Sequence, residues 1–172
     1  MTGPVLVVEL PRALSQAALS RLHVLLLSSS TCCEDHGGAT FDVSVPGGAL
    51  GIRSGEGPRP FLVGVGDSVL GTTDDDGEMH VAGLIGFVPT HSITVSAMFN
   101  DAVDHTATAL LTAAVLDAVG EGVAWAELRY GQESSVAGLE GVIATTTEPP
   151  MAYGSAGFLR AWAAQPAFRL VK

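Results

Sequence analysis

Short runs of apolar, mostly β-branched residues recur along this chain, and only three stretches show the three-and-four spacing typical of a helix. The strand-like runs span residues 4–10, 40–45, 60–66, 81–88, 92–99, 123–128, 141–147 and 168–171. Helical spacing occurs over residues 16–27, 102–119 and 156–164. Because most strands follow one another directly, the order predicts an α+β fold: a largely antiparallel sheet with two or three helices packed on one face.

The best-defined helix is expected from Ala102 to Val119, because its sequence carries both start and stop signals. Asp101 can cap its N-terminus, with Asp104 as the acid three residues further on. Gly120 follows the last helical residue and can adopt the left-handed conformation that ends a helix. Apolar residues recur along one face of this stretch, which predicts that it packs against the sheet.

Two segments are expected to lack regular structure. Residues 46–60 contain five glycines and three prolines, which predicts a mobile loop. The acidic run from Asp74 to Glu78, with His80 close behind, falls between two expected strands. A calcium-binding EF-hand loop alternates its oxygen ligands and ends in a glutamate at its twelfth position, and this run does neither. We therefore expect a solvated hairpin tip here, and no metal site.

Length and charge limit the classes of function. The 172 residues fit one domain spanning residues 1–172, and a hydrophobic fraction of 47% is enough to build a core. The chain holds 18 Asp and Glu against 8 Lys and Arg, for a formal net charge of −10. An acidic chain lacks the basic face that binds phosphate backbones or anionic membranes, so we expect neither nucleic acid nor membrane as a partner.

Several cofactor-binding and catalytic motifs are missing from the sequence. Lys172 is the only lysine, which excludes a Walker A loop and an interior Schiff-base lysine. The chain contains no dinucleotide fingerprint and no Gly-x-Ser-x-Gly nucleophile elbow. Nucleotide hydrolysis, Rossmann-type redox chemistry and ordinary serine hydrolysis are therefore not expected, and we predict no cofactor.

The N-terminus and the cysteines indicate a reducing compartment. No basic segment precedes the first apolar run, so we expect no signal peptide. The only two cysteines, Cys32 and Cys33, are neighbours in the chain. Adjacent Cα atoms lie closer together than a relaxed disulfide prefers, so no bond between them is expected. These features predict a cytoplasmic protein with free thiols.

Cys33 and His36 form the first candidate catalytic pair. A thiol beside an imidazole can act as a nucleophile, and both side chains can ligate a metal. Glu34 and Asp35 lie between them, and acids raise the pKa of a thiol and weaken it as a nucleophile. No second cysteine pair is present to complete a tetrahedral metal site. A structural role is therefore favoured over a catalytic one.

Asn100, Asp104 and His105 form the second candidate group, at the expected start of the helix 102–119. A histidine oriented by a carboxylate can act as a general base. Acids at a helix N-terminus also complement the helix dipole and cap its free amides. We favour a capping role for Asp104. For His105, a catalytic role and a purely structural role both stay open.

The last quarter of the chain, residues 157–162 and 165–172, resembles the C-terminal signature of a family of small uncharacterised actinobacterial proteins. Phe99-Asn100, Asp104-His105 and the stretch from Gly120 to Val123 are similar to the middle of that family. Gly3-Pro4 and the apolar run that follows are similar to its start. The size and composition of this family are similar to those of bacterial immunity proteins. The family has no established activity, so the resemblance implies a fold and a source only.

Two functional hypotheses follow. The first is a non-enzymatic acidic binding module, an immunity-type protein that neutralises a basic protein partner, because acidic surfaces attract basic ones and speed their association. The second is a small cytoplasmic enzyme or ligand-binding protein acting on an apolar metabolite. Abundant alanine and glycine leave room for a pocket between sheet and helices. Its acid–base or nucleophilic groups would be His105 with Asp104, or Cys33 with His36.

Overall fold

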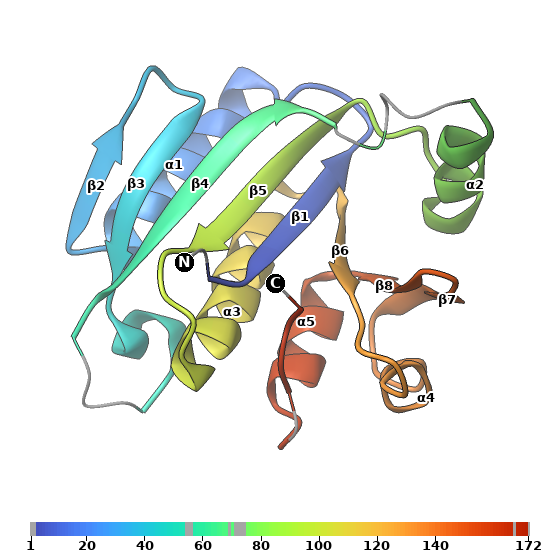
Figure 1. The fold of residues 1–172 in the computed structure, drawn as a ribbon. Coiled ribbons are helices and arrows are strands. Elements are labelled where there is room, and N and C mark those ends of the chain that lie inside the picture. Colours follow the sequence, from blue (N-terminus) through green and yellow to red (C-terminus); the bar gives the residue numbers. More distant parts are fainter. Residues whose placement is uncertain (1–2, 54–56, 69, 71–74, 167, 172) are drawn as a thin grey trace.

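The computed structural model describes residues 3–53, 57–68, 70, 75–166 and 168–171, with the backbone alone for 75–79. The chain forms an eight-stranded sheet in the order β2-β3-β4-β5-β1-β6-β8-β7, and every pairing is antiparallel (Figure 1). The predicted α+β class is confirmed. The strands are β1 (Val5–Leu10), β2 (Cys32–Asp35), β3 (Thr40–Val45), β4 (Arg59–Asp67), β5 (His91–Ala97), β6 (Val123–Glu127), β7 (Val142–Thr147) and β8 (Pro150–Gly154). The helices are α1 (Gln16–Ser29), η1 (Gly47–Leu50), α2 (Asp75–Ile85), α3 (Ala102–Val119), α4 (Glu133–Val136) and α5 (Ala156–Ala163).

One face of the sheet carries the main core. Alternate strand residues such as Leu6, Val8 and Leu10 are fully buried on this face, beneath α1, α3 and α5 (Figure 1). Helix α3 packs against both other helices and keeps its predicted bounds, with Gly120 ending it at a φ of 80°. Within the described part of the chain, α3 is the one helix long and apolar enough to cross a membrane, and 61% of it is buried inside the protein.

Helix α2 lies on the opposite face and corrects two predictions. Residues 81–85 belong to this helix and do not form the strand expected over 81–88. The expected hairpin tip is also wrong, because the backbone is helical from Asp75 onward, while Asp74 lies outside the described residues. Val81, Leu84 and Ile85 have the spacing that a helix gathers on one side, and they pack over Val123 and Tyr153 of β6 and β8.

The edges and the C-terminal end show further differences from the sequence prediction. Strand β2 was not expected, because its exposed polar residues lack an apolar pattern. The β2–β3 hairpin forms through Gly37 and Gly38, whose φ angles of 82° and 80° suit glycine. Strand β8 was also missed. Residues 168–171 form no strand, and buried Leu170 instead anchors this segment in the core.

Candidate binding groove on the open face of the sheet

The half of the sheet that includes β2, β3, β4 and β5 has one open face. No helix of the described chain lies over this half on the side opposite α1 and α3 (Figure 1). Directly paired residues form a row across five adjacent strands on this face: Val5, Ser96, Leu62, Asp42 and Glu34. Val5 and Leu62 are 38% and 37% exposed. Along the row, the exposed side chains therefore change from apolar near the middle of the sheet to acidic at the β2 edge.

Two adjoining hollows extend this surface at the end of the sheet. The first, of about 350 Å³, contains Glu34 and Asp42 in its wall. The second, of about 820 Å³, reaches Asp101 at the start of α3. Both hollows share Pro60 and Met98, so they form one continuous depression. We call this depression the groove: it runs from Glu34 and Asp42, past Pro60 and Met98, to Asp101.

The β2–β3 end of the groove is acidic. Glu34 and Asp42 lie directly opposite each other on neighbouring strands, and both are exposed. His36 approaches this pair from the hairpin, with its Nε2 2.9 Å from Asp42 Oδ2. Both partners of that contact are more than half exposed, so solvent screens the interaction and it contributes little to stability.

The α3 end combines two carboxylates with one guanidinium group. Arg59 donates from an Nη atom to Asp101 Oδ2 at 3.2 Å, and the same nitrogen lies 3.6 Å from Asp104 Oδ1. Asp104 is 1% exposed, and its other oxygen accepts the backbone N–H of Asp101 at 2.7 Å. Asp104 therefore has the capping role predicted for it. Two carboxylates against one guanidinium leave one net negative charge, and the exposed carboxylate is that of Asp101, whose side chain is 71% exposed.

His105 and Asn100 lie close to this end and have different environments. His105 is 1% exposed, and its Nδ1 accepts the backbone N–H of Leu170 at 3.2 Å. This bond ties the C-terminal segment to α3. Asn100 lines the groove, and its Oδ1 is buried with no hydrogen-bond partner among the described residues. The structure thus brings Asn100 to the groove, buries Asp104 beside Arg59, and places His105 in the core.

Cys33 and His36 lie on different faces of the sheet. Cys33 pairs with Val43 and packs against the main core, whereas His36 contacts Asp42 on the open face. Burial raises the pKa of the Cys33 thiol, and the charges of Asp35 and Cys32 raise it further. Its thiolate is therefore disfavoured. The described residues contain no group of three His, Cys, Asp or Glu side chains placed to hold a metal ion.

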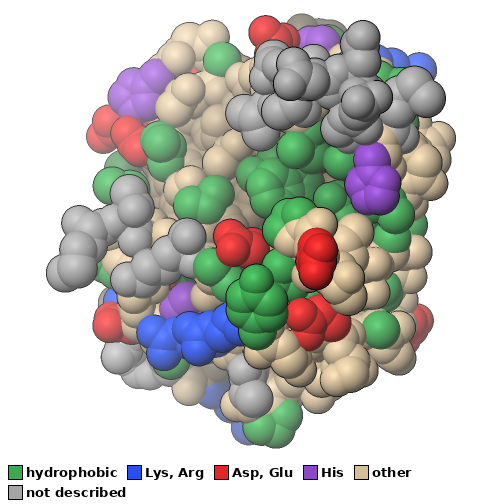
Figure 2. All heavy atoms as spheres, turned by 45° about the vertical axis from the view of Figure 1, so that its right-hand side comes forward, with side chains coloured by type: hydrophobic (Ala, Val, Ile, Leu, Met, Phe, Trp, Pro, Cys, Tyr) green, Lys and Arg blue, Asp and Glu red, His purple; other side chains and the backbone are tan. Residues whose placement is uncertain are grey.

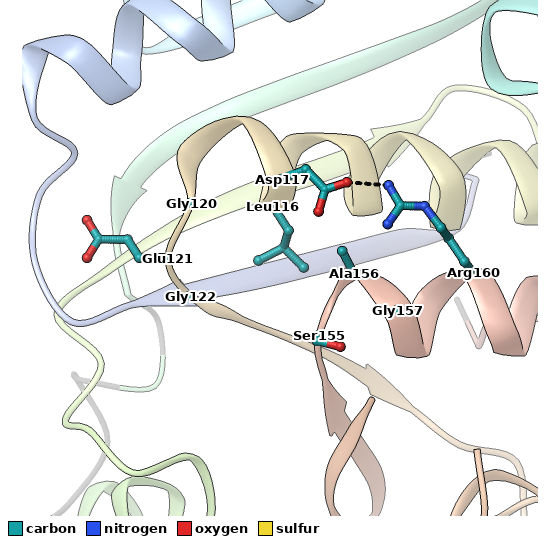
Figure 3. A pocket seen from close by; sticks show the side chains of 9 residues that line it. All are labelled: Leu116, Asp117, Gly120, Glu121, Gly122, Ser155, Ala156, Gly157 and Arg160. Carbon is teal, nitrogen blue, oxygen red and sulfur yellow. Dashed lines mark hydrogen bonds and ion pairs between the residues drawn. The ribbon is translucent and has the colours of Figure 1, made fainter. Parts of the chain in front are cut away.

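A third hollow lies between the end of α3 and the start of α5, with a volume of about 380 Å³ (Figure 3). Arg160 and Asp117 point toward one another across its rim and form an ion pair. Glu121, at the other side, accepts a hydrogen bond from Arg12 at 3.0 Å. Each of these carboxylates therefore already has a cationic partner within the chain.

A buried polar cluster lies on the same face as α2. Glu9 is fully buried on β1, and its Oε1 accepts a hydrogen bond from Trp125 Nε1 at 2.9 Å. Its Oε2 is buried with no hydrogen-bond partner among the residues described. Burial raises the pKa of neighbouring Tyr153, and the Glu9 charge raises it further. This cluster packs under Val81 and Ile85 of α2, away from the groove.

Sequence reasoning missed the groove residues Glu34 and Met98. It also missed Arg59, which does not line the groove but pairs with Asp101 at its α3 end. Apolar and polar residues alternate over residues 40–45, which predicts that Asp42 lies on the exposed side of a strand. Only the strand register, however, shows that Glu34 lies beside Asp42, and only the fold brings Arg59 to the start of α3. No local pattern in the sequence carries either relation.

Comparisons with known proteins place the chain in a family. A sequence profile for a family of unknown function, DUF6368, matches residues 2–172. The chain belongs to this family. The expected membership of an uncharacterised family is thereby confirmed. No curated protein and no solved structure matches this DUF6368 chain.

Proposed function

We propose that this chain is a non-enzymatic acidic binding module that holds a basic protein partner in the groove. The observation that carries this proposal is the arrangement of charge and apolar surface along the groove. Glu34 and Asp42 lie at one end and Asp101 at the other, while Met98 and Phe99 between them are 50% and 54% exposed. Exposed apolar side chains beside charges of one sign are typical of protein-binding surfaces.

The net charge alone does not select this face. In Figure 2, where the α2 side of the molecule comes forward, acidic side chains are scattered among apolar and uncharged ones. A net charge of −10 accelerates encounter with any basic protein. The groove adds to this a fixed position for the partner, because its acids flank apolar side chains that can be buried on binding.

More specifically, we propose that the chain is an immunity-type protein. The chain would come from an actinobacterium, remain in the cytoplasm and neutralise a basic toxin. The net charge and the resemblance to small actinobacterial proteins support this assignment. The thiols of Cys32 and Cys33, both free, agree with a reducing compartment.

The second candidate function is a small enzyme or ligand-binding protein for an apolar metabolite, supported by the apolar wall of the larger hollow. The proposed reactive pairs argue against it. Asp104 is bonded to the N-terminus of α3 and lies beside Arg59, and His105 holds the C-terminal segment. Cys33 and His36 lie on opposite faces of the sheet.

The test of the proposed function first asks whether a gene adjacent to this one encodes a basic protein, and the absence of such a gene would contradict the immunity-type assignment. Where one is present, its product is the ligand. Binding is measured by biolayer interferometry at 50 and 300 mM NaCl, for wild type and for Glu34→Gln/Asp42→Asn. Glu133→Gln/Glu140→Gln, at two positions outside the groove, is the matched control for the loss of two charges. We expect salt-sensitive binding that weakens about tenfold or more in the groove variant and not in the control. Equal loss in both variants, or binding unaffected by salt, would contradict the proposal.

A further inference from the structure

We infer that the groove binds one short extended segment of the partner, with apolar residues at its centre and arginine or lysine at both ends. This inference rests on the proposed function and specifies the partner chemistry for the same site. It follows from the order of side chains along the groove: acidic at Glu34 and Asp42, apolar at Met98 and Phe99, then acidic again at Asp101.

The floor of the groove favours an extended segment over a helix. Part of its floor is formed by Val43 and Phe61, whose side chains belong to the core on the other face, so these residues contribute no side chain to the groove. Ser44 and Pro60 add only small side chains. A helix is about 10–12 Å across with its side chains, which is more than two strand spacings in the sheet. A single extended strand with one row of inward side chains suits this space.

The span of the groove sets the spacing of the basic residues. Strands β2 and β5 are three positions apart in the sheet, a distance of about 14 Å at the usual strand spacing. Asp101 lies past the end of β5, which extends the path to roughly 15–20 Å. An extended chain covers roughly 3.3 Å per residue, so the two basic groups are about five or six residues apart.

The chemistry of each contact fixes the rest of the pattern. Exposed Met98 and Phe99 favour apolar partner side chains, and a methionine adapts its shape to several of them. The carboxylates of Glu34 and Asp42 suit a guanidinium group, which can form two parallel hydrogen bonds. Asp101 retains exposed carboxylate surface despite Arg59, so the second basic residue has a partner there.

Cys32 provides a native reporter for this inference. Its thiol is exposed and lines the groove, whereas Cys33 faces the core and has a raised pKa. In a Cys33→Ser background, alkylation of Cys32 by iodoacetamide reports whether the groove is occupied. Two eight-residue synthetic peptides of identical composition serve as probes. One has two arginines at each end of a Leu/Phe centre, and the other has all four arginines at one end.

We expect the first peptide to protect Cys32 at concentrations about tenfold lower than the second. Asp101→Asn removes one charged end and Glu34→Gln/Asp42→Asn the other, and each is expected to weaken the first peptide about fivefold or more. Asparagine is as good a helix cap as aspartate, so Asp101→Asn keeps α3 intact. Glu133→Gln should leave protection unchanged.

The outcomes separate the two claims. If both peptides protect Cys32 equally, the two-ended pattern is wrong while an acidic binding groove remains. If neither peptide protects Cys32, and the variants bind the neighbouring basic protein as wild type does, the groove itself is not the binding site and both claims fail.

Discussion

The buried hydrogen bond between Trp125 and Glu9 gives a quantitative prediction for Trp125→Phe. Glu9 is fully buried in the sheet, and Trp125 Nε1 donates to its Oε1 at 2.9 Å. Phenylalanine keeps an aromatic ring against α2 but removes this donor. The Glu9 carboxylate, whose Oε2 already has no partner among the described residues, then loses its hydrogen bond on Oε1.

The expected loss in the free energy of unfolding is about 2 kcal/mol, because hydrogen bonds to charged groups contribute about 1.5–3 kcal/mol. For a chain of this size, such a loss lowers the melting temperature by roughly 4–8 °C. Removing both partners is expected to cost less than removing one. Glu9→Met/Trp125→Phe should therefore be more stable than the sum of its single substitutions predicts, with a coupling of about 1–2 kcal/mol.

Urea unfolding measures each of these free energies. Trp162 remains as the fluorescent probe in the Trp125→Phe variants, since it is 2% exposed and stacks on Phe158 at a centroid distance of 5.4 Å. A loss below about 0.5 kcal/mol for Trp125→Phe would refute the reasoning. So would single substitutions whose effects simply add in the double variant.

Further predictions follow from three buried groups. The pKa of Tyr153 lies above 10.0, so the folded state keeps this proton to higher pH than the unfolded state, and stability falls as pH rises past 10.0. Glu9→Gln should lower the Tyr153 pKa without returning it to 10.0, because burial is the larger cause, and an NMR titration of the ring signals measures this. Cys33 should react with iodoacetamide more slowly than Cys32, and equal rates by mass spectrometry would show that its burial has no effect on its reactivity. His105→Ala should lose about 3 kcal/mol of stability, since it leaves a cavity and removes the acceptor for a buried backbone N–H. A wild-type urea midpoint for that variant would contradict this assignment.

Local signals in the sequence were enough to predict most elements of the fold. Helix α3 has the predicted bounds because Asp104 and Gly120 provide chemical signals at each end that do not depend on the rest of the chain. The prediction failed over residues 81–85, where a short apolar run fits a buried strand and a helix equally well. Only the apolar surface of β6 and β8 that α2 covers selects the helix.

The candidate site was less predictable, because its contacts depend on how distant segments of the chain meet. Asn100, Asp104 and His105 are close in sequence, so their proximity was expected, but helical geometry directs His105 into the core while Asp104 caps the helix. Arg59 reaches Asp101 from a strand 42 residues away in sequence. Such a contact depends on strand order and register, which hydrophobic periodicity does not encode.

An NMR chemical-shift map with the doubly arginine-flanked peptide tests the central claim most directly. We expect the largest amide shifts in β2 and β3 around Glu34 and Asp42, and from Met98 to Asp101. Amides at the hollow between α3 and α5, including that of Arg160, should not move. Shifts centred on that hollow, or no shifts at peptide concentrations up to about 1 mM, a weak-binding limit near −4 kcal/mol, would contradict the assignment of the groove as the binding site.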